Sequence, residues 1–122
     1  MKELLEEIEA YRKERGWTQQ NPVSLAKSVV IESAELLEVF QWSSPTLKEL
    51  RRDKETLAKL TPEMADVLIY LYCLCNDLEI NPDDIVRKKL AQVRKKYPPK
   101  LVKGNSANYY KLKKAHRAKG SK

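Results

Sequence analysis

Two short acidic motifs, each set in an apolar stretch with helical spacing, are the residues of this sequence best suited to chemistry. Glu32 and Glu35 are three residues apart, and so are Glu63 and Asp66. On a helix this spacing places both acids of a pair on neighbouring turns of one face, so that their oxygens can meet at a common point. Asp66 is surrounded by Met, Ala, Val, Leu and Ile, and an uncompensated carboxylate there would lose several kcal/mol of hydration.

A hard divalent cation would compensate these acids. Mg²⁺ is typically bound by a few carboxylates together with waters and substrate phosphates. We therefore predict a site for a divalent cation such as Mg²⁺, with carboxylate oxygens contributed by both motifs. A cation held in this way can activate water and clamp phosphate oxygens, which is what hydrolysis of a phosphoanhydride requires. Either Glu32 or Glu35 would also orient or deprotonate the attacking water.

The alternative is that the acids have no chemical role and are surface carboxylates paired with lysines. Either motif alone fits that interpretation well. The two motifs together fit it poorly, because a helical bundle that buries like charges without a cation would be strained.

The elements that must position these acids are predicted to be helices. The chain has 122 residues, 42% of them hydrophobic, and only three glycines, which indicates one all-α domain with a single core. Apolar periodicity predicts four helices, over residues 2–15, 24–42, 61–78 and 82–96. Gly16 is expected just past the first helix, Ser24 is expected to cap the second, and Thr61-Pro62-Glu63 is expected to begin the third.

The connections between these helices have their own signals. Asn21-Pro22 is expected in a loop, whereas Asn81-Pro82 is expected to begin the fourth helix. Residues 45–57 are highly charged and predict a short exposed helix or an ordered loop. The division that follows is a catalytic domain over residues 1–98 and a basic tail over residues 99–122, partly mobile or docked on a neighbouring subunit.

Charge is distributed unevenly along the chain. From Arg87 onward every charged residue is Lys or Arg, and the preceding residues are net negative although the whole chain carries +7. A basic end can bind an anionic small molecule, a partner subunit or nucleic acid. A helical nucleic-acid-binding or scaffolding module is therefore the alternative function, but basic tails are common and paired acid motifs are not, so nucleic acid is the less favoured partner.

Other signals point to a cytoplasmic protein. Residues 1–10 are charged and amphipathic rather than leader-like, and no apolar run reaches the ~18 residues that a membrane span requires. Cys73 and Cys75 are two residues apart, so on a helix their side chains diverge and are expected to remain free thiols.

The motifs resemble those of the MazG-like nucleotide pyrophosphohydrolases. The resemblance rests on the stretch from Leu25 to Trp42, on Glu63 to Tyr70, and on Lys95-Lys96-Tyr97-Pro98, and it covers about residues 4–112. Within that family the chain is similar to the small single-domain branch that includes dCTP pyrophosphatase. The resemblance implies an all-α four-helix bundle that assembles as a homodimer or homotetramer and uses Mg²⁺ to convert a nucleoside triphosphate, possibly dCTP or a modified analogue, to monophosphate and pyrophosphate.

The resemblance implies that the metal-binding acids are Glu32, Glu35, Glu63 and Asp66. It also implies roles for residues outside the acid motifs. Trp17, Trp42 and Tyr70 would form the base pocket, Lys89 would meet the phosphates, and Tyr97 is the tyrosine of the family's R/K-Y-P motif. Packing of the two tryptophans as lids on the core is the alternative. Val93 stands where the family often has an asparagine that helps hold the nucleotide, and valine can neither donate nor accept a hydrogen bond.

Overall fold

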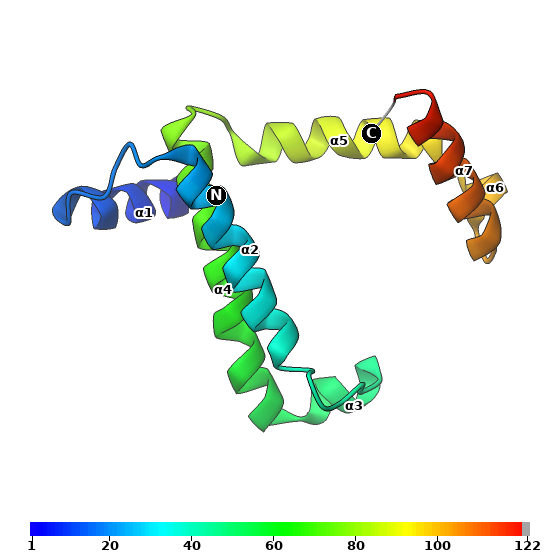
Figure 1. The fold of residues 1–122 in the computed structure, drawn as a ribbon, viewed down its shortest axis with the longest axis horizontal. Helices are drawn as coiled ribbons and strands as arrows, with labels where there is room; N and C mark the ends of the chain where they lie inside the picture. The colour runs from blue at the N-terminus through cyan, green and yellow to red at the C-terminus, as the bar shows by residue number, and fades with distance from the viewer. Residues whose placement is uncertain (121–122) are drawn as a thin grey trace. The chain divides into compact units, whose positions relative to one another are not determined.

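The computed structural model describes residues 1–120, which are helical with no strand (Figure 1). The all-α prediction is therefore confirmed for this part of the chain, and residues 121–122 of the predicted tail lie outside it. Two compact units divide at residue 80, Met1–Ile80 and Asn81–Lys122. No helix among the described residues is both long enough and apolar enough to cross a membrane.

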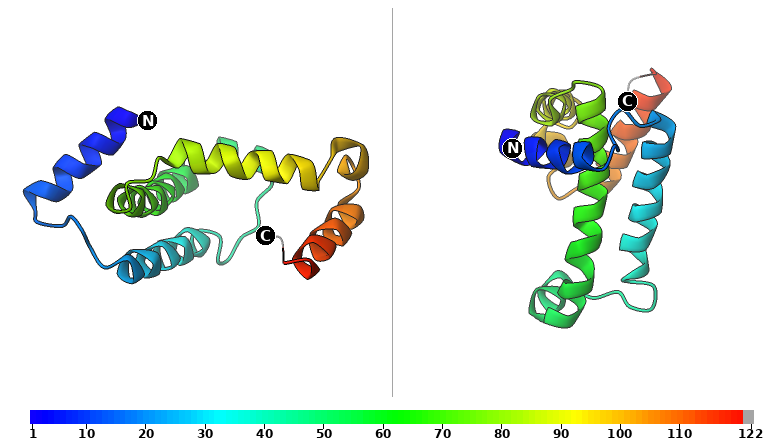
Figure 2. Two further views of the ribbon diagram at one scale, coloured as in Figure 1. Left: turned by 90° about the horizontal axis from the view of Figure 1, so that it is seen from above. Right: turned by 90° about the vertical axis from the view of Figure 1, so that its left-hand side faces the viewer.

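The first unit is built on a pair of long helices. The helices α2 (Pro22–Glu38) and α4 (Lys54–Asp77) lie side by side along most of the length of α2 (Figure 2). The short helix α3 (Leu47–Arg52) connects them and contacts α4. The first helix, α1 (Lys2–Glu14), packs against α4, and the Asn76 amide donates a hydrogen bond to the Leu5 carbonyl. The acid motifs therefore lie on the two helices that pack most extensively.

The second unit contains the remaining helices. The helix α5 (Pro82–Lys96) is followed by the single turn α6 (Pro99–Val102) and by α7 (Ser106–Ala118). Both α5 and α6 contact α7, and Tyr97 stacks against Tyr109 with ring centroids 4.8 Å apart. Much of the segment expected as a basic tail is thus helical, a feature that the scarcity of apolar residues did not suggest.

Two helix starts differ from the sequence prediction. The second helix begins at Pro22 and not at Ser24, because the Asn21 side chain accepts hydrogen bonds from the amides of Val23 and Ser24. Asn21-Pro22 is therefore a cap followed by proline at the first helical position, the same signal that Asn81-Pro82 gives for α5, where the prediction is confirmed.

The third predicted helix also begins earlier than expected. Asp53 caps α4 by accepting from the Thr56 amide at 3.0 Å and from its hydroxyl at 2.6 Å, so Pro62 lies inside the helix and does not begin it. An interior proline removes one backbone hydrogen bond and crowds the preceding turn. The packing of α4 against α2 and α3 compensates that local cost, so tertiary contacts override the start signal at Thr61.

Candidate functional site

The two acid motifs meet between α2 and α4. One carboxylate oxygen from each of Glu32, Glu63 and Asp66 lies within 4.8 Å of the others, close enough for one ion to bind all three. Glu32 contributes from α2, and the other two acids lie one turn apart on α4. The spacing of three residues thus places Glu63 and Asp66 on one face of α4, as predicted. The packing of α2 beside α4 brings this face to Glu32.

Two of these acids carry oxygens without a partner. Oε2 of Glu32 and Oε2 of Glu63 are both buried, and neither has a hydrogen-bond partner among the described residues. A buried carboxylate oxygen left in this way loses its hydration without compensation, which is costly in a folded protein. These orphaned atoms fit a hard cation well, because carboxylate oxygens are the ligands that Mg²⁺ prefers.

The fourth acid, Glu35, is exposed but acts on both half-buried glutamates, Glu32 and Glu63. A hydrogen bond with the Glu35 carboxyl, together with burial and the Glu35 charge, raises the pKa of Glu32. Burial first, and then the charge of Glu35, raises the pKa of Glu63. Negative charge is therefore concentrated here beyond what the protein itself neutralises, so a bound cation would lower the free energy of the cluster.

An apolar cavity of about 430 Å³ adjoins the acid cluster. Asp66 belongs to both, and Trp17, Tyr70 and Ile69 are among the residues that line the cavity. Burial, with the charges of Glu32 and Asp66, raises the pKa of Tyr70, so its hydroxyl keeps its proton and can donate a hydrogen bond. This volume and apolar lining are typical of small-molecule sites.

A buried ion pair fixes the segment that carries Trp17. Arg12 is only 2% exposed, and its guanidinium donates two hydrogen bonds to the Asp77 carboxylate, at 2.9 and 2.8 Å. The same guanidinium donates from Nε to the Trp17 carbonyl at 3.1 Å. Asp77 also accepts from the backbone amides of Gln19 and Gln20, which holds Gln19 at a φ of +56°, a conformation that non-glycine residues seldom adopt.

Sequence reasoning missed Arg12, Asp77 and Gln20, although one signal was available. Arg12 continues the inward stripe of α1 formed by Leu5 and Ile8, where an apolar residue would be expected. A cation on that face requires a buried partner, but its identity could not be read locally because Asp77 is 65 residues away. Gln20 lines the apolar cavity, and its side-chain oxygen accepts a hydrogen bond from Arg12.

The other candidates from the sequence lie elsewhere. Trp42 is 90% exposed beyond the end of α2 and does not line the apolar cavity. Lys89 and Tyr97 belong to the second unit, where with Val93 they line a separate cavity. Their roles toward a nucleotide, like those of the acids and of Trp17 and Tyr70, stay predictions.

The MazG-like family model matches residues 27–112, which include both acid motifs and the Tyr97-Pro98 motif. The chain belongs to the MazG-like family. Among the curated relatives of this MazG-like chain is dCTP pyrophosphatase 1 of Mus musculus, 36% identical over 102 residues, or 81% of this chain. The Homo sapiens protein of the same name is 33% identical over 101 residues, also 81% of this chain. In both comparisons the chain spans 59% of the relative's length.

A solved structure supports the family assignment at the level of the fold. A pyrophosphatase from Archaeoglobus fulgidus superposes with a TM-score of 0.72 and is 42% identical in sequence. The match covers 80% of this MazG-like chain and 92% of the archaeal one. Most of this chain therefore shares its architecture with that archaeal protein.

Proposed function

We propose that this chain is a metal-dependent nucleotide pyrophosphohydrolase that converts a nucleoside triphosphate to the monophosphate and pyrophosphate. The observation that carries the proposal is the acid cluster, in which Glu32, Glu63 and Asp66 offer oxygens within 4.8 Å and two buried oxygens have no protein partner. The names of the MazG-like relatives support this reaction class. Mg²⁺ is the proposed cofactor, because the donor set is all carboxylate.

Each part of the site has a separate task in this proposal. Glu32, Glu35, Glu63 and Asp66 hold the metal, which when bound supplies an activated water and neutralises phosphate charge. Glu35 is exposed beside the cluster and is the carboxylate best placed to accept the proton of the attacking water. Tyr70 donates a hydrogen bond from the edge of the cluster toward the substrate.

The base of the nucleotide would occupy the apolar cavity beside Asp66. Trp17 offers a ring for stacking, and Tyr11 supports that ring edge-on with centroids 6.0 Å apart. Gln20 lines the same cavity, and because its oxygen already accepts from Arg12, its amide nitrogen is available to donate to a base. A base with carbonyl or ring-nitrogen acceptors, as in dCTP or a modified analogue, suits such a donor.

The chain is also proposed to work as a homodimer or homotetramer, completing a four-helix bundle between copies. Along α2 and α4 the only buried residues are Leu25, Leu60 and Cys73, which is too small a core for two long helices. Val23, Val30 and Leu37 repeat every seven residues on α2 and are all exposed, Leu37 by 71%. Such a stripe is typical of a helix–helix interface, and a second copy could bring Trp42, Lys89 and Tyr97 to the acids.

The test of the reaction is a panel of ribo- and deoxynucleoside triphosphates incubated with the full chain and Mg²⁺, with monophosphate and pyrophosphate both quantified. We expect turnover of at least one triphosphate, and loss of turnover in Glu63→Gln. The control is Glu55→Gln, which removes an exposed acid in the first turn of α4. Turnover by Glu63→Gln equal to that of the unmodified chain would refute the proposed role of the cluster.

Assembly is tested separately by light scattering after gel filtration. We expect a species of two or four chains, and a smaller species for Leu37→Glu, because a charge in the stripe opposes its burial. A monomer of about 14.2 kDa at all concentrations would contradict the assembly while leaving the chemistry of the cluster untouched.

A further inference from the structure

The loop between α1 and α2 reaches the apolar cavity through two residues, Trp17 and Gln20. Both are bound by the buried Arg12, which donates from Nε to the Trp17 carbonyl at 3.1 Å and from Nη2 to the Gln20 Oε1 at 3.4 Å. Asp77 accepts from the same guanidinium at 2.8 Å and from the backbone amide of Gln20 at 3.2 Å. The ion pair therefore holds Gln20 at its backbone and at its side chain.

The contact with Arg12 decides which end of the Gln20 amide is left for a ligand. A guanidinium carries only N–H donors, so the atom that it meets must be the amide oxygen. The amide nitrogen of Gln20 makes no hydrogen bond within residues 1–120. At this position the cavity therefore presents a donor and not an acceptor.

These contacts go beyond what an ion pair between two helices requires. Asp77 alone would suffice as the anion for Arg12, yet the guanidinium also donates to two residues of the loop. Asp77 likewise accepts from the amide of Gln19, whose φ of +56° a non-glycine residue seldom adopts. The loop is thus held in a conformation that its own residues do not favour, and this conformation includes a cavity residue.

We propose that Arg12 is a positioning residue for the nucleotide base, because it fixes the Gln20 amide as a hydrogen-bond donor. A donor of fixed identity distinguishes bases by where they carry an acceptor, whereas a freely rotating amide would offer either its oxygen or its nitrogen. Every nitrogen of the guanidinium already donates within the chain, so Arg12 acts through Gln20 and not by contact with the base. The inference rests on the proposed function, since it takes a nucleotide base as the occupant of the cavity.

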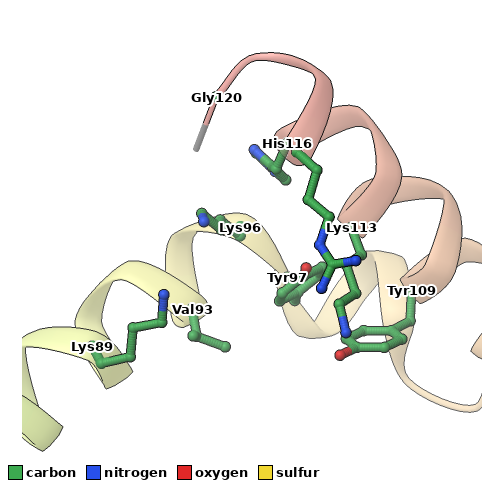
Figure 3. Close-up of a pocket in the computed structure, with 9 residues that line it drawn as sticks. Lys89, Val93, Lys96, Tyr97, Tyr109, Lys113, His116 and Gly120 are labelled. Atoms are coloured by element: carbon green, nitrogen blue, oxygen red, sulfur yellow. The ribbon is translucent and has the colours of Figure 1, made fainter. Parts of the chain in front are cut away.

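The experiment is calorimetric titration of the full chain, in Mg²⁺, with the α,β-methylene analogues of dCTP, dTTP, dATP and dGTP. The methylene group replaces the oxygen between the two phosphorus atoms that hydrolysis would separate, so binding is measured without turnover. The readout is base selectivity, the ratio of the largest to the smallest Kd. All the analogues share the same phosphates, so cations elsewhere, such as Lys96 and Lys113 beside the cavity of the second unit (Figure 3), affect each Kd alike and cancel in the ratio.

The first variant is Gln20→Glu, which keeps an oxygen for Arg12 but has no donor at neutral pH. We expect the Kd of the best-bound analogue to rise about tenfold and selectivity to fall. Thermal unfolding should occur at the same or a higher temperature, because a charged acceptor strengthens the contact with the guanidinium. The matched control is Gln19→Glu, which adds the same charge at an exposed residue outside the cavity and should keep selectivity. Selectivity retained in Gln20→Glu would show that Gln20 only satisfies Arg12, and would overturn the proposal.

A double-mutant cycle tests whether Arg12 acts through Gln20. Arg12→Lys keeps a cation for Asp77 but loses the planar set of donors, so it should lower selectivity. In a Gln20→Ala background the same change should leave selectivity where it is, although it still lowers the free energy of unfolding. Additive losses of selectivity would contradict the proposal, and so would an unmodified chain that binds no analogue or all of them equally. Selective binding of the analogues without hydrolysis of any triphosphate would instead count against the proposed function alone.

Discussion

Charge is buried in two regions of the first unit, and the two regions treat it in opposite ways. Between α1 and α4, Arg12 and Asp77 face each other with two hydrogen bonds. Backbone groups and the side chains of Glu9 and Gln20 supply their other hydrogen bonds. Between α2 and α4, carboxylates face carboxylates, and Glu32 and Glu63 each keep a buried oxygen that has no hydrogen-bond partner within residues 1–120. The first region is complete within the chain, whereas the second is the proposed metal site. The contrast is the one expected between a structural ion pair and a cluster that binds a ligand.

The largest expected effect comes from breaking the buried ion pair between Arg12 and Asp77. Asp77→Asn removes the two-hydrogen-bond partner of the buried Arg12 guanidinium and leaves it only the 3.2 Å ion pair with Glu9. We expect a loss of about 3 kcal/mol in the free energy of unfolding. Urea unfolding of the full chain measures it. Glu55→Gln, which breaks the exposed 3.9 Å pair with Lys59, should change stability little. Similar losses in both variants would remove the distinction between the two kinds of charge.

Metal binding at the acid cluster between α2 and α4 should raise the free energy of unfolding. At a concentration of about 100 times its Kd, Mg²⁺ is expected to stabilise the native chain by about 2.7 kcal/mol. Glu63→Gln should lose most of this gain, yet in EDTA it should unfold at a higher temperature than the unmodified chain, because it removes one of several like charges. Thermal unfolding with and without Mg²⁺ gives both values. An equal gain from Mg²⁺ in the variant would show that the cluster does not bind the ion.

A smaller effect is expected at Trp17. Its carbonyl accepts a hydrogen bond from Arg12, and its side chain lines the cavity to which Asp66 also belongs. Loss of a base-stacking ring costs about 1–3 kcal/mol, so Trp17→Ala should raise KM for the triphosphate substrate about fivefold to a hundredfold. Trp42→Ala is the informative companion. It should leave KM unchanged if the cavity of one chain suffices, and should raise KM if a second copy contributes that ring. Unchanged KM in both variants would contradict a tryptophan-lined base pocket.

The smallest expected effect is in the pH dependence of stability. The hydrogen bonds from Arg12 hold the pKa of Asp77 below the ordinary value of 3.8. The stability that this shift contributes is therefore present above pH 3.8 and is lost as the pH falls from there through the lowered pKa. Urea unfolding in EDTA between pH 5 and 2 should show this decline in the native chain and a shallower one in Asp77→Asn. Parallel profiles would refute the assignment.

Much of this architecture could be predicted from local pattern. Apolar periodicity and few glycines indicated an all-helical chain, and Gly16 and Asn81-Pro82 marked a helix end and a helix start that the structure confirms. The acid motifs were also visible, because a spacing of three residues places side chains on one helical face whatever that helix packs against. These are short-range properties, so the sequence alone determines them.

Other features depended on contacts between distant residues. The start at Thr61 was wrong because α4 continues past Pro62 when it packs on its neighbours, and the helix α7 was not anticipated from a basic, sparsely apolar segment. The acid motifs meet only because α2 packs beside α4, which local spacing does not determine. The partner of Arg12 is likewise distant, since Asp77 is 65 residues away. Sequence spacing fixes which face of its own helix a side chain occupies. Only packing between helices decides what that face meets, and here it paired Arg12 with an anion and brought the acids of two helices together.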